Sequence, residues 1–287
     1  MKDWPIGIFD SGVGGLTVYR AVKKLLPNEK IIYLGDTARI PYGTRSPSTV
    51  KRYAHQDAAF LIKYSVKMLV IACNTISSVA IESLKLAFSV PILGVIEPGA
   101  KRAASITRNG RVGVIATEAT VESDAYKIAI KACQPEIDVF SQACPLFVPL
   151  AEEGWSSHHV TKLVAQEYLK PLIDQKIDTL VLGCTHYPIL RNIIQEIVGK
   201  NVTLLDSGEC VAAEVVDLLQ QQKAFASSKN GDDLFYVTDS GKRFRRTAEL
   251  FLGEELKNLT AVDIWQTDTT ANVLGSLDML TELSDIH

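Results

Sequence analysis

The sequence predicts an α/β protein with two pseudo-symmetric lobes, each with a mostly parallel sheet, and an active site in the cleft between them. Strand-like apolar runs alternate with helix-like segments, which is typical of βαβ units. The same succession begins again in the second half of the chain. Two of the apolar runs end in a cysteine, at Cys73 and Cys184, and ligands bind at the carboxyl ends of strands in open α/β sheets.

The first half of the chain contains four strand-like runs separated by helical segments. Ser46 and Pro47 are typical of the N-cap and the first residue of a helix, so a helix is expected to begin there. The expected elements are strands at 6–10, 31–35, 67–73 and 92–96, and helices at 12–26, 46–64 and 75–88.

The second half repeats this order, which predicts a structural duplication. The matching segments are 6–11 and 112–117, 31–34 and 137–140, 69–75 and 180–186, and 92–95 and 202–205. The offset is 106 residues for the first two pairs and 111 residues for the cysteine runs. We therefore expect a first lobe built from 1–97 plus 208–265 and a second lobe built from 98–207.

The remainder of the chain does not begin a third copy. It contains a helical segment at 209–222, a polar loop at 224–233, a strand at 234–238, a helix at 243–256 and a strand at 259–265. We expect this part to return to the first lobe and complete it. Residues 266–287 are polar and rich in Thr and Asp, and we expect a C-terminal tail there.

Composition argues against several classes of protein. The 287 residues are 47% apolar and 22% charged, and no apolar run reaches the ~20 residues of a membrane-spanning helix. A net charge of −3 without a basic block argues against nucleic acid or an anionic membrane as the main partner. Residues 1–5 lead directly into a strand, so we expect no signal peptide and a cytoplasmic protein. The five cysteines lack metal-binding spacing, which indicates free thiols and no metal site.

Cys73 and Cys184 are the strongest candidates for chemistry. Each follows a buried strand and precedes polar residues that open a helix, and the N–H groups and dipole of a helix start favour a lowered thiol pKa. Two thiols in near-copies of one segment predict that they face each other across one pocket. This geometry suits the movement of a proton from one face of a carbon to the other. The alternative is that each is a small buried residue without reactivity.

Two turns in the first half have ligand-binding potential. The glycine-rich turn from Asp10 to Gly15 lets backbone N–H groups approach a ligand, or is only a tight turn capped by Ser11. The carboxylate of Asp10 suits an ammonium group or a protonated partner. The segment Pro41–Thr44 either contacts a ligand, with Tyr42 closing over it, or is an ordinary turn.

Polar residues also follow the cysteines and the second strand of the second half. Asn74-Thr75 and Thr185-His186 serve either as helix caps or as ligand contacts. His186, next to Cys184, has the chemistry of an acid or a base. One of Glu152 and Glu153 is expected to face the cleft.

Taken together, these motifs resemble those of the bacterial glutamate racemases, in the cofactor-independent aspartate/glutamate racemase superfamily. The matching segments are IGIFDSGVGGLT at 6–17, GDTARIPYG at 35–43, IACNT at 71–75, PLFVPLAEEG at 145–154 and LGCTHYP at 182–188. The resemblance implies two α/β lobes, conversion of L-glutamate to D-glutamate without a cofactor, and supply of D-glutamate to peptidoglycan. We also expect a homodimer.

The resemblance also implies roles for individual residues. It makes Cys73 and Cys184 the acid/base thiols, assisted by Asp10, Glu152 and His186, with Asp36 a weaker candidate. The implied substrate contacts are Asp10, Ser11, Pro41, Tyr42, Gly43, Asn74, Thr75, Thr117, Thr120, Thr185 and His186.

Proton transfer at a carbon is consistent with this pair of thiols. Two bases on opposite faces need not move, and one must be thiolate while the other is thiol. No sequence feature marks a pyridoxal-binding lysine, so hydrogen bonds within the site must stabilise the carbanion. Three alternatives stay open: a racemase for aspartate or another acidic amino acid, a cysteine hydrolase that uses Cys184 and His186, and an amino-acid-binding protein without catalysis.

Overall fold

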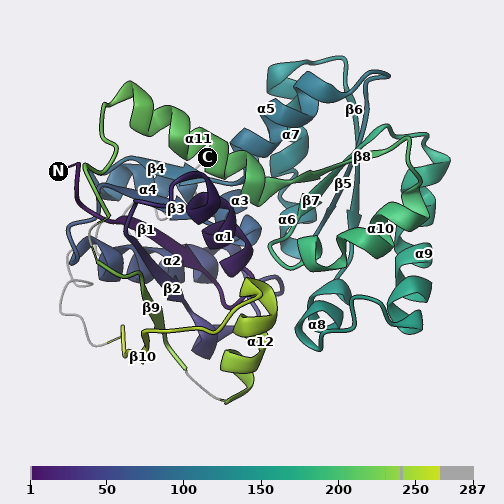
Figure 1. Cartoon of the computed structure of the whole chain (residues 1–287). Helices are drawn as coiled ribbons and strands as arrows, with labels where there is room; N and C mark the ends of the chain where they lie inside the picture. The colour runs from purple at the N-terminus through teal and green to yellow at the C-terminus, as the bar shows by residue number, and fades with distance from the viewer. Residues whose placement is uncertain (1, 230, 240–241, 266–287) are drawn as a thin grey trace, which may run out of the picture.

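The chain forms two parallel sheets that lie side by side (Figure 1). A computed structural model describes residues 2–229, 231–239 and 242–265. The strands are β1 (Ile6–Asp10), β2 (Ile31–Gly35), β3 (Met68–Ile71), β4 (Ile92–Gly94), β5 (Arg111–Ala116), β6 (Asp138–Ala143), β7 (Thr179–Gly183), β8 (Thr203–Asp206), β9 (Leu234–Val237) and β10 (Leu259–Ala261).

Helices connect these strands. The α-helices are α1 (Leu16–Leu25), α2 (Pro47–Ile62), α3 (Asn74–Val79), α4 (Ile81–Ala87), α5 (Ile96–Ile106), α6 (Glu118–Glu122), α7 (Ala125–Cys133), α8 (Phe147–Glu152), α9 (His159–Asp174), α10 (Arg191–Val198), α11 (Ser207–Gln221) and α12 (Lys242–Leu252). Two 3₁₀ helices are η1 (Thr37–Arg39) and η2 (Tyr187–Leu190). The expected helix at 75–88 is two helices, α3 and α4, that meet at Ala80.

The two sheets share one topology, which confirms the predicted fold class. Their strand orders are β10-β9-β2-β1-β3-β4 and β6-β5-β7-β8, and all the strand pairs are parallel. The order second, first, third, fourth therefore occurs in both halves. The strands that carry the cysteines keep their offset of 111 residues, because Met68 lies opposite Ile6 as Thr179 lies opposite Val112.

The sheet register corrects two of the four predicted matches by two residues. Ile31 lies opposite Ile6, whereas Val139 lies opposite Val112, so Ile31 corresponds to Val139 and not to Ile137. A slip of two residues keeps each side chain on the same face, because successive side chains of a strand alternate. The apolar pattern therefore matched while the position was wrong.

The match of the fourth strand is wrong in the same way. Ile92 lies opposite Leu69, and Leu204 lies opposite Leu180. The residue that corresponds to Ile92 is therefore Leu204 and not Val202.

The C-terminal part returns to the first sheet, where β9 pairs with β2 and β10 pairs with β9. The chain passes between the sheets through α5 and α11, which pack on each other over the junction (Figure 1). The lobe boundaries expected at 97/98 and 207/208 stay a prediction, and the expected tail at 266–287 lies outside the described residues.

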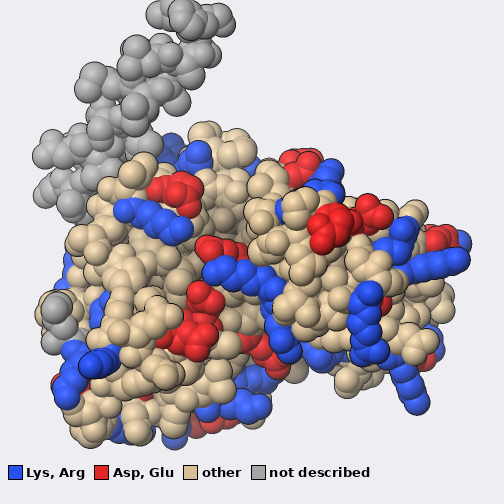
Figure 2. Space-filling model, turned by 90° about the horizontal axis from the view of Figure 1, so that it is seen from above, with Lys and Arg blue, Asp and Glu red and all other residues tan. Residues whose placement is uncertain are grey.

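Burial follows the alternation of side chains along the central strands. Ile8 and Val70 lie in an apolar core that continues into the second sheet, whereas Phe9 and Ile71 lie in a second core on the face covered by α2. In the described part of the chain, none of the helices combines the length and the apolar character needed to cross a lipid bilayer. Acidic and basic side chains are interspersed over the face shown in Figure 2.

Candidate active site

A cavity of about 340 Å³ lies at the carboxyl ends of strands from both sheets. Its walls follow β1, β2 and β3 on one side and β5, β6 and β7 on the other. The lining residues are Ser11, Gly12, Val13, Ile40, Pro41, Tyr42, Gly43, Thr44, Cys73, Asn74, Thr75, Thr117, Glu118, Pro145, Val148, Pro149, Glu152, Cys184, Thr185 and His186. The predicted site residues therefore line one cavity, except for Asp10, Thr120 and the weaker candidate Asp36, which are not part of its lining.

One thiol from each sheet enters this cavity, and both are 6% exposed. Cys73 is the N-cap residue of α3, and its Sγ lies 3.6 Å from Ser11 Oγ. Cys184 follows β7, but the next element is the short η2 rather than the α-helix expected from sequence. Its Sγ lies 3.8 Å from His186 Nδ1.

The expectation that a helix start lowers the thiol pKa is wrong for Cys73. Burial and the nearby charge of Asp10 raise the pKa of Cys73 to about 12. Hydrogen bonds from the Ile76 N–H, in the first turn of α3, and from Ser11 act in the opposite direction but do not prevail. The effect of the helix start is therefore present and is outweighed by desolvation.

His186 connects Cys184 to Glu152. Its Nδ1 faces Cys184, and its Nε2 lies 3.1 Å from Glu152 Oε1. Burial lowers the pKa of His186, but hydrogen bonds to Cys184 and Glu152 and their negative charge prevail and raise the pKa to about 10. The ring of Phe251, from α12, contacts the His186 ring edge-on at 5.3 Å. The His186 ring is therefore held between the sulfur of Cys184 and the carboxylate of Glu152, in surroundings that raise its pKa and favour the imidazolium.

Asp10 lies at the end of β1 and is fully buried behind Ser11. Its Oδ2 accepts a hydrogen bond from the Gly12 N–H at 2.9 Å, and its Oδ1 is buried without a hydrogen-bond partner among the described residues. Burial raises the pKa of Asp10, while the charge of His186 and backbone N–H groups act against it. A buried carboxyl group with an unused oxygen is ready to accept a hydrogen bond or a proton.

The glycine-rich turn packs the two halves of the site against each other. A Cβ at Gly14 would lie 2.2 Å from Thr185 Oγ1 and 2.5 Å from His186 Nδ1. Thr17 Oγ1, one turn further on, donates a hydrogen bond to the Thr185 carbonyl at 2.9 Å. The absence of a side chain at Gly14 thus lets the Thr185-His186 turn approach the first sheet.

Hydroxyl groups from both halves meet next to Cys73. Thr75 Oγ1 lies 2.9 Å from Thr117 Oγ1, which in turn lies 2.9 Å from Thr120 Oγ1. Thr120 thus supports the two lining residues without reaching the cavity. Thr117 also caps α6 by accepting the Thr120 N–H at 3.4 Å.

The side chain of Asn74 connects the two sheets. Its Oδ1 accepts a hydrogen bond from Tyr126 Oη at 2.7 Å, and its Nδ2 donates to Ser207 Oγ at 3.4 Å. Ser207 Oγ donates to the carbonyl of Leu182, two residues before Cys184, at 3.1 Å. The strand ends that carry the two thiols are therefore linked by buried hydrogen bonds.

The wall after β2 is anchored away from the cavity. The Tyr42 hydroxyl donates to Asp36, which does not line the cavity, while Tyr42 itself is part of the lining. The Gly43 carbonyl accepts the Ala119 N–H at 3.2 Å, which joins this wall to α6.

Several lining residues were missed by sequence reasoning. These are Ile40, Glu118, Pro145, Val148 and Pro149, whereas Gly12, Val13 and Thr44 lie in the two turns that were expected to contact a ligand. Ile40, Glu118 and Pro145 lie beyond the ends of β2, β5 and β6, so the rule that strand ends face the ligand could have found them. Val148 and Pro149 lie on α8, whose orientation toward the cavity has no local signal in the sequence.

Two parallel sheets of one topology, with polar strand ends meeting at one cavity, define a two-lobed α/β enzyme. The family model for Asp/Glu/Hydantoin racemases matches residues 6–215, and the chain belongs to this family.

Individual relatives agree with this assignment. A glutamate racemase of Geobacter metallireducens is 51% identical over 260 residues, which cover 90% of this chain and 96% of that protein. One from Syntrophus aciditrophicus is 50% identical over 261 residues, which cover 91% and 97%. The crystal structure of glutamate racemase from Francisella tularensis in complex with D-glutamate superimposes with a TM-score of 0.88 at 43% identity, covering 93% of this chain and 100% of that one.

Proposed function

We propose that the protein interconverts L-glutamate and D-glutamate, with Cys73 and Cys184 as the two acid/base groups. The observation that carries the proposal is the single cavity into which each sheet delivers one buried thiol. Relatives named glutamate racemase support the choice of substrate over aspartate, and so does the related structure that binds D-glutamate.

The environments of the two thiols differ, and this difference supports different starting roles for them in the proposed reaction. Asp10 opposes negative charge on Cys73, whose pKa is raised to about 12, so Cys73 rests as the thiol. The imidazolium of His186 lies next to Cys184 and stabilises negative charge on its sulfur. In our proposal, the Cys184 thiolate takes the α-proton of one enantiomer while Cys73 donates its proton to the opposite face. The other enantiomer reacts after the protons have been exchanged.

Hydrogen bonds are the means by which the site holds the substrate and stabilises the carbanion. Within the described chain the lining includes no Lys or Arg. The carboxylates of glutamate would therefore be bound by backbone N–H groups and by the hydroxyls of Ser11, Thr75, Thr117 and Thr185. Asp10 suits the ammonium group, and Glu152 acts through His186.

The proposal also covers the metabolic role of the product, the location of the protein and its oligomeric state. D-glutamate made by this reaction would supply peptidoglycan synthesis in the cytoplasm, and the protein would act without a cofactor as a homodimer. Sedimentation velocity on the purified protein tests the oligomeric state.

The decisive experiment is incubation of the protein with L-glutamate in D₂O, followed by chiral analysis and mass measurement. We expect D-glutamate that carries one deuterium at Cα. Cys73→Ala and Cys184→Ala should each lose racemisation by several orders of magnitude, within the range that deletion of an acid/base group spans.

Substrates with a β-leaving group separate the two thiols. Each single mutant, with its remaining sulfur deprotonated, should still remove the α-proton and expel the leaving group from the enantiomer whose α-proton faces that thiolate, so the two mutants should prefer opposite enantiomers. Racemisation that survives Cys73→Ala at a near wild-type rate would contradict the proposal. It would favour a single nucleophile at Cys184, for which the contact with His186 is already in place.

A further inference from the structure

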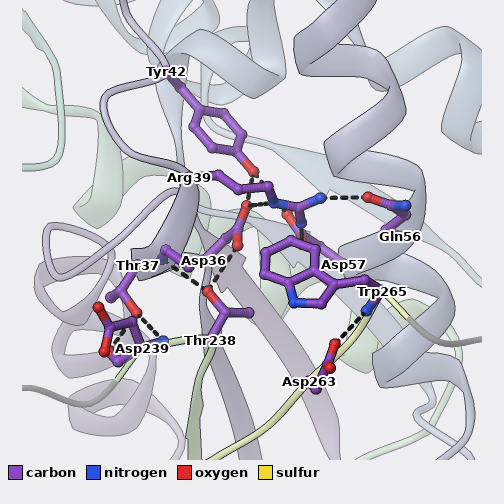
Figure 3. Close-up of polar contacts among 11 residues, drawn as sticks. Asp36, Thr37, Arg39, Tyr42, Gln56, Asp57, Thr238, Asp239, Asp263 and Trp265 are labelled. Carbon is purple, nitrogen blue, oxygen red and sulfur yellow. Dashed lines mark hydrogen bonds and ion pairs between the residues drawn. The ribbon is translucent and has the colours of Figure 1, made fainter.

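A buried cluster of charged side chains lies next to the cavity but outside it (Figure 3). Asp36 and Asp57 have fully buried side chains, and the Arg39 side chain is 9% exposed. None of the three lines the cavity. Breaking a buried ion pair leaves an uncompensated charge and is costly, so we expect these side chains to resist displacement.

Arg39 is the centre of this cluster. Its guanidinium donates to Asp36 through Nε, to Gln56 through Nη1, and to Asp57 Oδ1 through Nη2 at 2.9 Å. The ring centroids of Tyr53 and Trp265 lie 4.1 and 4.3 Å from its central carbon. Contacts in the plane of the guanidinium and against its faces leave it little freedom.

The C-terminal part of the chain supplies one side of the cluster. Trp265 follows β10, and its backbone N–H donates to Asp263 Oδ1 at 3.0 Å. Thr238, at the end of β9, donates to Asp36 Oδ1 at 2.8 Å and accepts the Ala38 N–H at 2.9 Å. Both Thr238 and Trp265 lie beyond residue 215, where the match to the family model ends.

The other side of the cluster is the cavity wall. The Tyr42 hydroxyl donates to Asp36, and the neighbours of Tyr42 on both sides line the cavity. The next residue, Gly43, is in contact with the second sheet. Its carbonyl accepts the Ala119 N–H at 3.2 Å, and a Cβ at Gly43 would lie only 3.1 Å from Thr117 Cβ. A displacement of this wall would therefore alter both the cavity and the contact between the two halves.

We infer that Arg39, Asp57 and Trp265 are positioning residues that hold the wall 40–44 in the arrangement that binds substrate. The inference rests on the proposed racemisation of glutamate. Burial, together with the charge of Asp36, raises the pKa of Asp57, and the charge of Arg39 acts against it, so the guanidinium holds both carboxyl groups in this cluster. The Arg39–Asp36 contact in turn fixes the oxygen that receives the Tyr42 hydroxyl, so the ring of Trp265 acts on the cavity through Arg39.

Replacement of Trp265 tests the inference, with Trp4 as a matched control. Trp265 is 40% exposed and Trp4 is 42% exposed, and Trp4 does not line the cavity. Loss of one ring from the guanidinium should raise KM for both enantiomers about fivefold in Trp265→Ala, with kcat within about twofold of wild type. Trp265→Phe keeps a ring against Arg39 and should restore KM, and Trp4→Ala should leave both constants unchanged.

Arg39→Lys is the second variant. It keeps the positive charge but loses the fork of donors and the flat face, so KM should rise in the same direction as in Trp265→Ala. Wild-type KM in both variants, or a loss of kcat with KM unchanged and a lower Tm, would show a purely structural role and overturn the inference.

A calorimetric titration with D-glutamate makes the test independent of turnover. A wild-type protein that binds D-glutamate but does not racemise it would refute the proposed function, while the Kd of Trp265→Ala would still decide the role of the cluster. Absence of glutamate binding by the wild type would overturn both.

Discussion

Glu152→Gln isolates the charge that keeps His186 protonated. His186 Nε2 lies 3.1 Å from Glu152 Oε1, and the pKa of His186 is about 10 against an ordinary value of 6.5. This difference corresponds to about 5 kcal/mol. Cys184 and Glu152 both contribute to it, so we expect the variant to lower the pKa of His186 and to lose part of this free energy, about 2 kcal/mol.

The raised pKa of His186 has a defined consequence for stability. A group whose pKa is higher in the folded state binds more protons there, so its contribution is complete below about pH 6.5 and is lost as the pH rises through about 10. The free energy of unfolding of Glu152→Gln should therefore be about 2 kcal/mol below that of wild type at neutral pH, and the two should converge above about pH 10.

Urea unfolding from pH 6 to 10.5 measures this convergence, and NMR titration of labelled histidine measures the pKa directly. His186→Asn assigns the resonance, since the chain has five histidines. Glu153→Gln is the matched control, because it removes the adjacent carboxylate, whose side chain is 44% exposed. A stability difference that stays constant over this pH range, or a His186 resonance that titrates near 6.5 in wild type, would refute the reasoning.

Two further predictions concern the contacts between the halves of the site. Gly14→Ala introduces a Cβ 2.2 Å from Thr185 Oγ1, so we expect a loss of about 1–3 kcal/mol in unfolding free energy and at least a tenfold loss of kcat/KM. Gly12→Ala is the control and should keep its Tm, because the nearest atom to its new Cβ would be 3.4 Å away. A Gly14→Ala protein with unchanged stability and activity would show that the turn is not tightly packed. Tyr126→Phe removes the hydrogen-bond donor to Asn74 Oδ1 and should lower kcat/KM about tenfold, which is the equivalent of one buried hydrogen bond. Steady-state kinetics in both reaction directions measure this change. A wild-type kcat/KM would show that the Tyr126–Asn74 hydrogen bond does not contribute to the site.

Much of the fold could be predicted because its signals are local. Apolar runs at strand length, separated by helix starts such as Ser46-Pro47, are written in neighbouring residues, and parallel strands place their carboxyl ends at one edge. The same rule predicted that Cys73, Cys184 and the residues that follow them lie together, and they line a common cavity. Register was less accessible, because a shift of two residues leaves the apolar pattern unchanged.

The fold class, the duplicated topology and the cysteines at the strand ends could therefore be inferred from the order of residues alone, since each depends on residues that are close in the chain. Tertiary structure decided the electrostatics: the pKa of Cys73 is raised because burial and Asp10 outweigh a helix start that is local. It also brought Trp265 onto Arg39, across more than 200 residues of chain. Burial, charge and packing depend on neighbours that only the folded chain brings together.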